Sequence, residues 1–321
     1  MSVTQGTVLA YSENHEIMLQ LLAKGRELAD KVGVDLCALT VNPSDGRPGE
    51  LVEHGADKVY VVDDPSMENF RVEPYRSVVL EAVNIAQPDI ILIGATKRGK
   101  ELAARVASAL DTGCMTECFQ LDVDDEGRLK AERLTYGGST IAHEVSNRKP
   151  HMATVPSRAF NKLEPSQRAG EIVEIKVEIS DPRVNVVETR EKSKGDVNLE
   201  DASIIVSAGR GFKAEEDLKL LKELAEVLGA NIGCTRPIAA DLGWMEEWIG
   251  ISGHKVSPKL YVACGVSGTI QHAAGIRDSQ IIVSINNEET SNIHGFSDYS
   301  IVGDLYTVLP ALTKALKEKL K

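Results

Sequence analysis

The sequence has few aromatic residues, no excess of basic side chains and no long apolar run. Aromatic residues make up only 4% of its 321 residues, which argues against the base-stacking surfaces that bind single-stranded nucleic acid. The formal net charge of -12 argues against a duplex partner, because phosphate binding needs a basic face. No apolar stretch approaches the roughly 20 residues that cross a bilayer. We therefore expect no nucleic-acid partner and no membrane insertion.

Cysteine is scarce and scattered. The five cysteines form no CxxC pair, and no histidine accompanies the neighbouring Cys114 and Cys118. Because an iron–sulfur cluster needs about four thiolates, we expect no metal site and mostly buried, reduced thiols in a cytoplasmic protein. The N-terminus has neither the basic flank nor the apolar stretch of a signal peptide, and it predicts a first strand instead.

The N-terminal third alternates strand and helix patterns. Strands are predicted over 7–12, 34–41, 58–64 and 88–96, and helices over 14–32, 48–54, 74–86 and 97–110. The run over 88–96 is apolar without alternation, which is typical of a strand buried on both faces. Strands joined by helices of this length predict a parallel sheet with right-handed crossovers.

After residue 114 the pattern becomes rich in β-structure and contains no long helix. Four stretches, 115–123, 128–138, 139–146 and 151–157, predict an antiparallel extension of the same sheet. A loop over 159–170 precedes an alternating, half-exposed strand over 171–180. The highly charged segment 186–202 predicts a linker near 192–201. The length suits two domains, which we place at 1–195, a scaffold and subunit-interface domain, and 196–321.

A second α/β pattern follows the linker. Strands are predicted over 203–211, 230–237, 259–266, 279–286 and 299–303, with an amphipathic helix over 214–229 and another helix at the C-terminus. The predicted fold class is therefore α/β, with an N-terminal parallel-sheet domain that carries a β-rich extension and a C-terminal Rossmann-like domain.

Two glycine-rich segments in this second part could hold a nucleotide. Residues 209–214 match G-x-G-x-x-A between a strand and a helix, although a tight turn that needs glycine is an alternative interpretation. A nicotinamide site would carry an acidic residue about 20 positions on, and this place is taken by Thr235 and Arg236. Residues 265–272 run from a strand through a glycine turn into a helix, whose free N–H groups suit a phosphate.

The segment from 207 to the C-terminus resembles the alpha subunit of electron-transfer flavoproteins. The motifs that carry this resemblance are SAGRG (207–211), CTRP (234–237), IGISG (249–253), LYVACGVSGTIQH (260–272), IIVSINN (281–287) and SDYSIVGDL (297–305). The N-terminal part agrees more loosely, through residues 94–110 and the β-rich stretch after them. The resemblance implies FAD as the cofactor.

The resemblance also implies which residues bind FAD. Arg210 is expected to contact the dinucleotide, Thr235 to bond the cofactor and Arg236 to lie against the isoalloxazine ring, where a cation favours the reduced, anionic flavin. Ser252 is expected at the flavin N5 nitrogen, and Ile251 replaces the glutamine of the usual V-G-Q-T-G motif.

Further residues are implied along the rest of the cofactor. The segment 267–272 is expected along the pyrophosphate and ribityl chain, with a protonated or donating His272 near the pyrimidine edge. Asn286 could instead cap a turn, and Asp304 could be a helix-start residue favoured by the dipole. The full expected set is Arg210, Thr235, Arg236, Ile249, Gly250, Ile251, Ser252, Ser267, Gly268, Thr269, Ile270, Gln271, His272 and, at the adenosine end, Asn286, Asp304 and Leu305.

The resemblance implies an electron carrier rather than a substrate-converting enzyme, with no catalytic residues of its own. The implied partners are a beta subunit, a flavin dehydrogenase such as an acyl-CoA dehydrogenase, and ferredoxin or a quinone reductase as acceptor. An NADH-linked electron-bifurcating system is a further expectation. A nicotinamide-dependent dehydrogenase and a non-redox nucleotide-binding protein stay open as alternatives.

Overall fold

The chain forms two compact units. The computed structural model describes residues 6–44, 46–179, 183–189 and 199–320. We call Met1–Thr189 unit 1 and Arg190–Lys321 unit 2. The boundary expected between residues 195 and 196 lies outside the described residues and stays a prediction.

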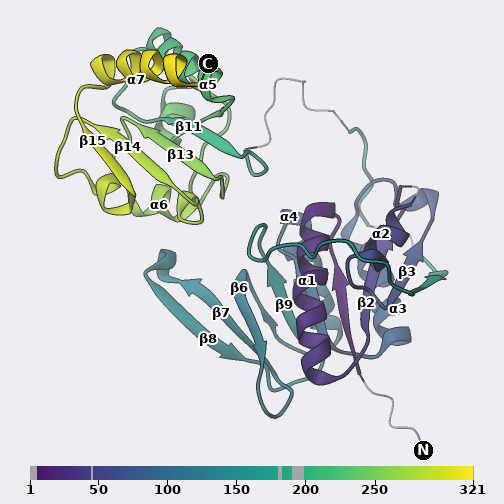
Figure 1. Cartoon of the computed structure of the whole chain (residues 1–321). Helices are drawn as coiled ribbons and strands as arrows, with labels where there is room; N and C mark the ends of the chain where they lie inside the picture. The colour runs from purple at the N-terminus through teal and green to yellow at the C-terminus, as the bar shows by residue number, and fades with distance from the viewer. Residues whose placement is uncertain (1–5, 45, 180–182, 190–198, 321) are drawn as a thin grey trace, which may run out of the picture. The chain divides into compact units, whose positions relative to one another are not determined.

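Unit 1 is built on a parallel sheet with the strand order β10-β3-β2-β1-β4-β9-β5. Its strands are β1 (Thr7–Tyr11), β2 (Leu36–Val41), β3 (Lys58–Val62), β4 (Pro88–Gly94), β5 (Cys114–Met115), β9 (His151–Val155) and β10 (Glu171–Glu174). Its helices are α1 (His15–Val32), α2 (Arg47–Glu53), α3 (Val72–Ala86) and α4 (Lys97–Ala109), close to the predicted ranges (Figure 1).

Alternate residues of β1 enter two cores on opposite faces of this sheet. Val8 packs with apolar residues of α1 on one face, and Leu9 packs with apolar residues of α3 and α4 on the other. A strand covered on both faces needs apolar side chains in both directions, which explains the missing alternation in β4. Because all strands run in parallel, their carboxyl ends meet at one edge.

The expected antiparallel extension of the parallel sheet is wrong. The strands β6 (Cys118–Val123), β7 (Leu129–Thr135) and β8 (Thr140–Val145) form a separate antiparallel sheet, whereas β5 and β9 stay in the main sheet and pair in parallel. The chain leaves the main sheet at Glu117, whose φ of 53° lies in the left-handed region.

The strand predicted over 171–180 is shorter than expected. The strand β10 ends at Glu174, which pairs with Val61 near the end of β3. Pairing therefore stops where the partner strand stops. Residue 180 of the predicted range lies outside the described residues.

Unit 2 contains a second parallel sheet with the order β12-β11-β13-β14-β15. Its strands are β11 (Ile204–Ala208), β12 (Asn231–Cys234), β13 (Leu260–Cys264), β14 (Ile282–Asn286) and β15 (Tyr299–Val302). Helices α5 (Leu218–Leu228) and α7 (Leu305–Lys319) cover one face, and α6 (Ile270–Ile276) lies on the other (Figure 1). The predicted α/β class is confirmed.

Short helical turns complete the two units. They are η1 (Pro65–Met67), η2 (Tyr136–Gly138), η3 (Glu215–Asp217), η4 (Pro237–Asp241) and η5 (Asn292–Phe296). None of the helices in the described ranges combines the length and the apolar character that a membrane crossing requires.

Candidate functional site

A cavity of about 370 Å³ lies at the carboxyl ends of β11 and β13. From β11 the chain continues to β12 on one side, whereas β13 pairs with β11 on the other side. Open α/β sheets bind ligands at such a reversal of strand order. The expected site residues that line the cavity are Arg210, Thr235, Ser267, Gly268, Thr269, His272, Asn286, Asp304 and Leu305.

Two glycine turns touch each other, backbone against backbone, at the base of this cavity. The Gly211 amide donates to the Gly265 carbonyl at 3.0 Å. A Cβ atom on Gly209 would lie 2.3 Å from the carbonyl oxygen of Gly265, and Gly265 itself has a φ of +63°. The tight-turn interpretation of the first motif is therefore correct, and the same turns leave the backbone open to a ligand.

A buried hydroxyl without a partner faces the cavity. Thr235 follows β12, is 8% exposed, lines the cavity, and its Oγ1 has no hydrogen-bond partner among the residues described. An unsatisfied buried hydroxyl costs about 1–3 kcal/mol, which a bound ligand would offset. The glycine turns and this hydroxyl fit a dinucleotide such as FAD.

Exposed arginines surround the same edge. Within the described parts of the chain, the side chains of Arg210 and Arg236 form no hydrogen bond or ion pair. Arg210 lines the cavity, whereas Arg236 lies between two lining residues, Thr235 and Pro237. Both guanidinium groups are available to an anionic ligand, to which arginine binds through several N–H donors.

The turn 265–269 places the N-terminus of α6 at the cavity. Gly268 has a φ of +74°, and a Cβ atom there would lie 2.3 Å from the Ile293 nitrogen. Thr269 is the N-cap residue of α6 and makes no side-chain cap hydrogen bond. The first N–H groups of a helix lack partners within it, so this end of α6 offers donors. The side chains of Ile270 and Gln271 are exposed and lie outside the cavity lining.

The loop that holds Ile249 to Ser252 also lies outside the cavity lining but is attached to it. Its Ile249 amide donates to the Cys234 carbonyl at 2.8 Å, and its Ile251 amide donates to the Gln271 carbonyl at 2.9 Å. Gly250 has a φ of +149° and packs against α6. The Ser252 hydroxyl accepts a hydrogen bond from Trp248 Nε1 at 3.2 Å, which leaves its own proton free to donate.

His272 is a neutral residue that holds this loop in place. Its Nδ1 donates to the Ile249 carbonyl at 3.0 Å, and its Nε2 accepts from the Tyr261 hydroxyl at 2.9 Å. Burial lowers the pKa of His272 to about 4. Of the two forms expected from the sequence, protonated or donating, burial disfavours the protonated one, because desolvation disfavours the charged form. Both ring nitrogens are already used within the protein.

Acid is expected to destabilise unit 2 through His272. The unfolded imidazole has a pKa of about 6.5, and the folded pKa is about 4, so the unfolded state binds more protons between these values. The contribution is fully present above about pH 6.5 and is lost as the pH falls toward about 4, with a loss on the order of 3 kcal/mol. Urea unfolding at a series of pH values measures it. Because burial also lowers the pKa of His151 in unit 1, His272→Gln is the reference, and an equal pH slope in that variant would contradict the assignment.

Asn286 and Asp304 both make structural hydrogen bonds, as expected if Asn286 caps a turn and Asp304 starts a helix. Asn286 Nδ2 donates to the Val266 carbonyl at 2.7 Å, and its Oδ1 accepts from the Glu288 amide at 2.9 Å. Asp304 is the N-cap of α7 and accepts from the Tyr306 amide at 3.0 Å. Both side chains still line the cavity, so their ligand contacts stay predictions.

Sequence reasoning missed part of the lining. The additional residues are Gly211, Lys213, Pro237, Gly265, Val266, Asn287 and Tyr306. Most lie inside the motifs already quoted, so the motif boundaries could have found them. Tyr306 had no such signal. Its hydroxyl accepts from the Lys213 amide at 2.8 Å and donates to Asp217 at 2.7 Å, which joins α7 to the first glycine turn.

No cluster of histidine, cysteine and acidic side chains in the described ranges could hold a metal ion. All five cysteines are free thiols. Cys114 and Cys118 lie on two different strands, β5 and β6.

Comparison with known proteins identifies one family over most of the chain. The family model "Electron transfer flavoprotein domain" matches residues 8–180, and "Electron transfer flavoprotein FAD-binding domain" matches residues 198–277. The electron transfer flavoprotein subunit alpha of Thermoanaerobacterium thermosaccharolyticum is 39% identical, over 97% of both chains. Protein FixB of Azotobacter vinelandii is 39% identical over 95% of this chain and 88% of its own. Subunit LctC of the lactate dehydrogenase (NAD(+),ferredoxin) of Acetobacterium woodii is 36% identical over 93% of this chain and 72% of its own.

Proposed function

Because the chain belongs to the electron transfer flavoprotein alpha-subunit family and carries its FAD-binding domain, we propose that it carries electrons between two redox partners. The crossing of the two glycine turns at the reversal of strand order is the observation that carries the proposal. Bound FAD supplies the electron-accepting and electron-donating chemistry, and the protein sets its position and potential.

Different residues of unit 2 bind the cofactor, stabilise its charge and position the loop beside it. Arg210 and the first turn of α6 bind the negatively charged diphosphate. The Thr235 hydroxyl and the free proton of Ser252 donate to polar atoms of the cofactor, and Arg236 stabilises negative charge near the flavin ring. His272 is a positioning residue, because it ties the loop at Ile249 to α6. The position after β12 holds Thr235 and not an acidic residue, which favours FAD over a nicotinamide dinucleotide.

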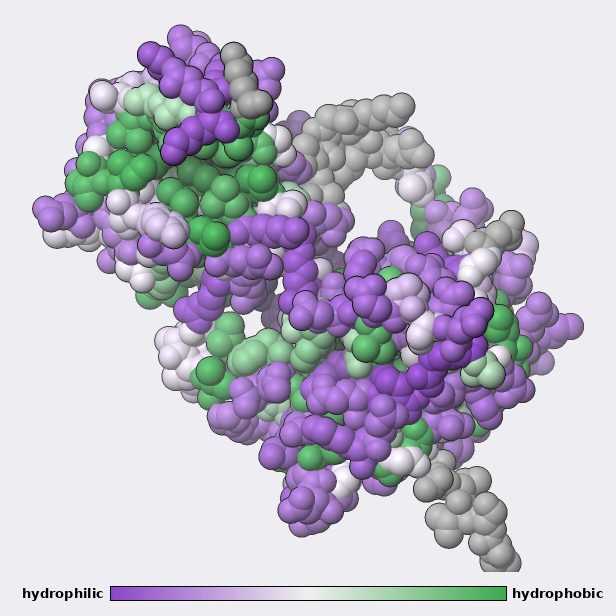
Figure 2. All heavy atoms as spheres, in the orientation of Figure 1, coloured by the Kyte–Doolittle hydropathy of each residue, from purple (hydrophilic) through white to green (hydrophobic). Residues whose placement is uncertain are grey.

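An alpha subunit implies a beta subunit as partner, and apolar surface beside the site supports a partner that closes it. Ile251 and Ile270 are 51% and 68% exposed. They lie close together, because the Ile251 amide donates a hydrogen bond to the carbonyl of Gln271, the residue after Ile270. Figure 2 shows apolar side chains gathered on the visible face of unit 2, which supports a part for unit 2 in this contact. Unit 1, which matches the electron transfer flavoprotein domain, is proposed as scaffold and as a further part of the subunit interface.

We also propose which proteins donate electrons to this chain and accept electrons from it. A flavin dehydrogenase such as an acyl-CoA dehydrogenase is the proposed donor, and ferredoxin or a quinone reductase is the proposed acceptor. The relative from Acetobacterium woodii has NAD(+) and ferredoxin in its name, which supports an NADH-linked bifurcating system. The free thiols support a cytoplasmic location.

The visible spectrum of the protein purified with its beta subunit tests the function. We expect a yellow complex with absorption bands at about 370 and about 450 nm, because oxidised flavin absorbs there. The bands are expected to bleach when a flavin dehydrogenase and its substrate are added. A colourless complex that takes up no FAD would overturn the proposal.

A further inference from the structure

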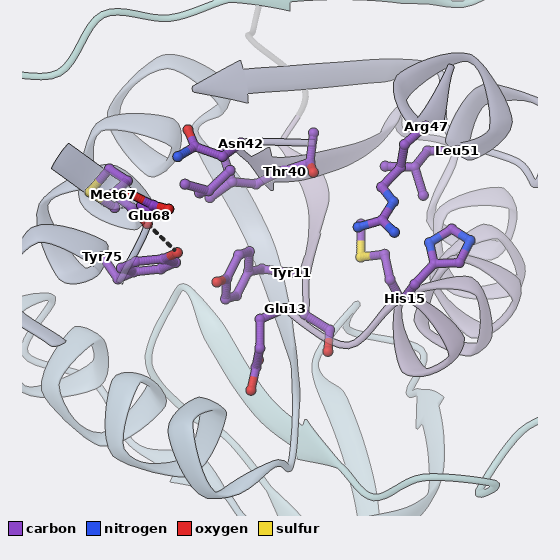
Figure 3. Close-up of a pocket in the computed structure, with 14 residues that line it drawn as sticks. Tyr11, Glu13, His15, Thr40, Asn42, Arg47, Leu51, Met67, Glu68 and Tyr75 are labelled. Carbon is purple, nitrogen blue, oxygen red and sulfur yellow. Dashed lines mark hydrogen bonds between the residues drawn. The ribbon is translucent and has the colours of Figure 1, made fainter. Parts of the chain in front are cut away.

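Unit 1 contains a cavity that the proposed electron transfer does not use. It has a volume of about 350 Å³ and lies beyond the carboxyl ends of β1 and β2. This is the edge of a parallel sheet at which α/β folds bind ligands. Figure 3 shows side chains from the ends of β1 and β2, from the start of α1, from α2, and from Met67, Glu68 and Tyr75 around it.

Three buried polar atoms of residues that line this cavity have no hydrogen-bond partner among the residues described. They are the Tyr11 hydroxyl, Glu13 Oε2 and His15 Nδ1. Tyr11 is only 2% exposed, and burial raises its pKa well above the usual value, so the hydroxyl keeps its proton. Unsatisfied buried groups are rare and costly. Three in one cavity indicate a ligand.

The partly satisfied groups show which atoms are left for that ligand. Glu13 Oε1 accepts from the Thr96 hydroxyl, so Oε2 remains. His15 Nε2 donates to Glu50 at 3.1 Å, so Nδ1 remains. The Tyr75 hydroxyl donates to the Met67 carbonyl at 3.1 Å and is already used.

The two sides of the cavity differ in chemistry. Arg47 and His15 lie together on one side, and Tyr11 and Tyr75 lie on the other, next to Met67 (Figure 3). Arg47 is partly buried, and its side chain has no hydrogen bond or ion pair within the described ranges. A partly buried, unpaired guanidinium suits an anionic group. The aromatic side suits a flat ring, and Glu13 accepts from an N–H or O–H donor on it.

We propose that this cavity is a second ligand site, which binds a nucleoside monophosphate or a molecule of the same chemistry. The phosphate contacts Arg47, a hydroxyl group of the ligand donates to His15 Nδ1, and the ring lies beside Tyr11, with its polar hydrogens directed to Glu13. The volume is in the range of small-ligand pockets, about 300–1,000 Å³. All of its lining residues belong to unit 1, whereas those of the FAD cavity belong to unit 2.

Calorimetric titration of the full-length chain, saturated with FAD to fill the cavity of unit 2, tests the proposal. AMP, adenosine and inorganic phosphate are titrated separately. We expect AMP to bind in saturable fashion and more tightly than either fragment. Tyr11→Phe is expected to weaken AMP binding about tenfold, because one hydrogen bond is lost. Arg47→Ala is expected to reduce AMP binding to the level of adenosine.

Matched variants separate binding from folding. Tyr60→Phe removes another buried phenol of the same unit, and Arg105→Ala removes an exposed arginine paired with Glu101. Both are expected to bind AMP like the unchanged chain. Without ligand, Tyr11→Phe is expected to unfold at the same or a higher temperature, because it removes an unsatisfied hydroxyl. No AMP binding, equal binding of phosphate and AMP, or an unchanged affinity in both Tyr11→Phe and Arg47→Ala would overturn the proposal.

Discussion

Gly209→Ala is expected to lose most of the FAD from the purified complex. Its Cβ atom would lie 2.3 Å from the Gly265 oxygen and 2.6 Å from the Gly265 carbonyl carbon, and neither backbone atom can move like a flexible side chain. Overpacking of this kind costs about 1–3 kcal/mol, which corresponds to roughly a tenfold to hundredfold loss of affinity if the shift falls on the bound state. The ratio of flavin absorbance to protein measures the loss.

Gly229→Ala is the matched control. Gly229 also lies in unit 2, has a φ of +60° and would place its Cβ atom in open space. The Gly229→Ala variant loses about 1 kcal/mol of folding free energy, because alanine is strained in the left-handed region. Residue 229 does not line the cavity, so the FAD content of this variant is expected to stay unchanged. Far-UV circular dichroism shows whether each variant is folded. A folded Gly209→Ala complex that retains its full FAD would contradict the role of the crossing turns.

Arg236→Ala is expected to lower the reduction potential of the bound flavin. The guanidinium is exposed, has no partner in the parts of the chain described and follows Thr235 at the cavity wall. Two unit charges about 4 Å apart interact by about 4 kcal/mol at an effective dielectric constant of about 20, and exposure reduces this. A loss of about 1.4 kcal/mol corresponds to about 30 mV for a two-electron couple.

Spectroelectrochemical titration of the complex measures this change. Arg236→Lys keeps the positive charge and is expected to retain most of the potential, although it loses the planar fork of donors. An exposed basic residue of unit 2 outside the cavity lining, such as Lys222 on α5, provides the variant that should leave the potential unchanged. If Arg236→Ala leaves the potential unchanged as well, this arginine has no part in tuning the flavin.

The sequence predicted the main sheets well because their patterns are local. The strand β4 and the helices α1 and α5 follow from apolar periodicity and end signals such as Gly33 and Gly229, which adopt left-handed conformations. The separate sheet of β6 to β8 could not be predicted in this way. Alternation shows that a stretch is a strand, but not which strand it pairs with, because pairing depends on contacts between distant residues.

The same distinction between local patterns and contacts of distant residues applies to the candidate site. Motifs placed Arg210, Thr235 and Ser267 at strand ends, and parallel strands bring their carboxyl ends together. Polar side chains such as Asn286 and Asp304 were harder to judge. Their residue types suit a ligand, a turn or a helix cap equally, and only the hydrogen bonds they make show that they also serve the fold.

The sequence by itself determined the α/β class, the family and FAD as the cofactor, because these depend on motifs whose residues are close along the chain. Only the tertiary structure decided the charge of His272, which is set by burial against Tyr261 and Ile249. It also decided which buried hydroxyls lack partners, among them Thr235 in unit 2 and Tyr11 in unit 1. Burial and hydrogen bonding depend on residues far apart in the sequence, and their energies can be assigned only once those residues have been brought together.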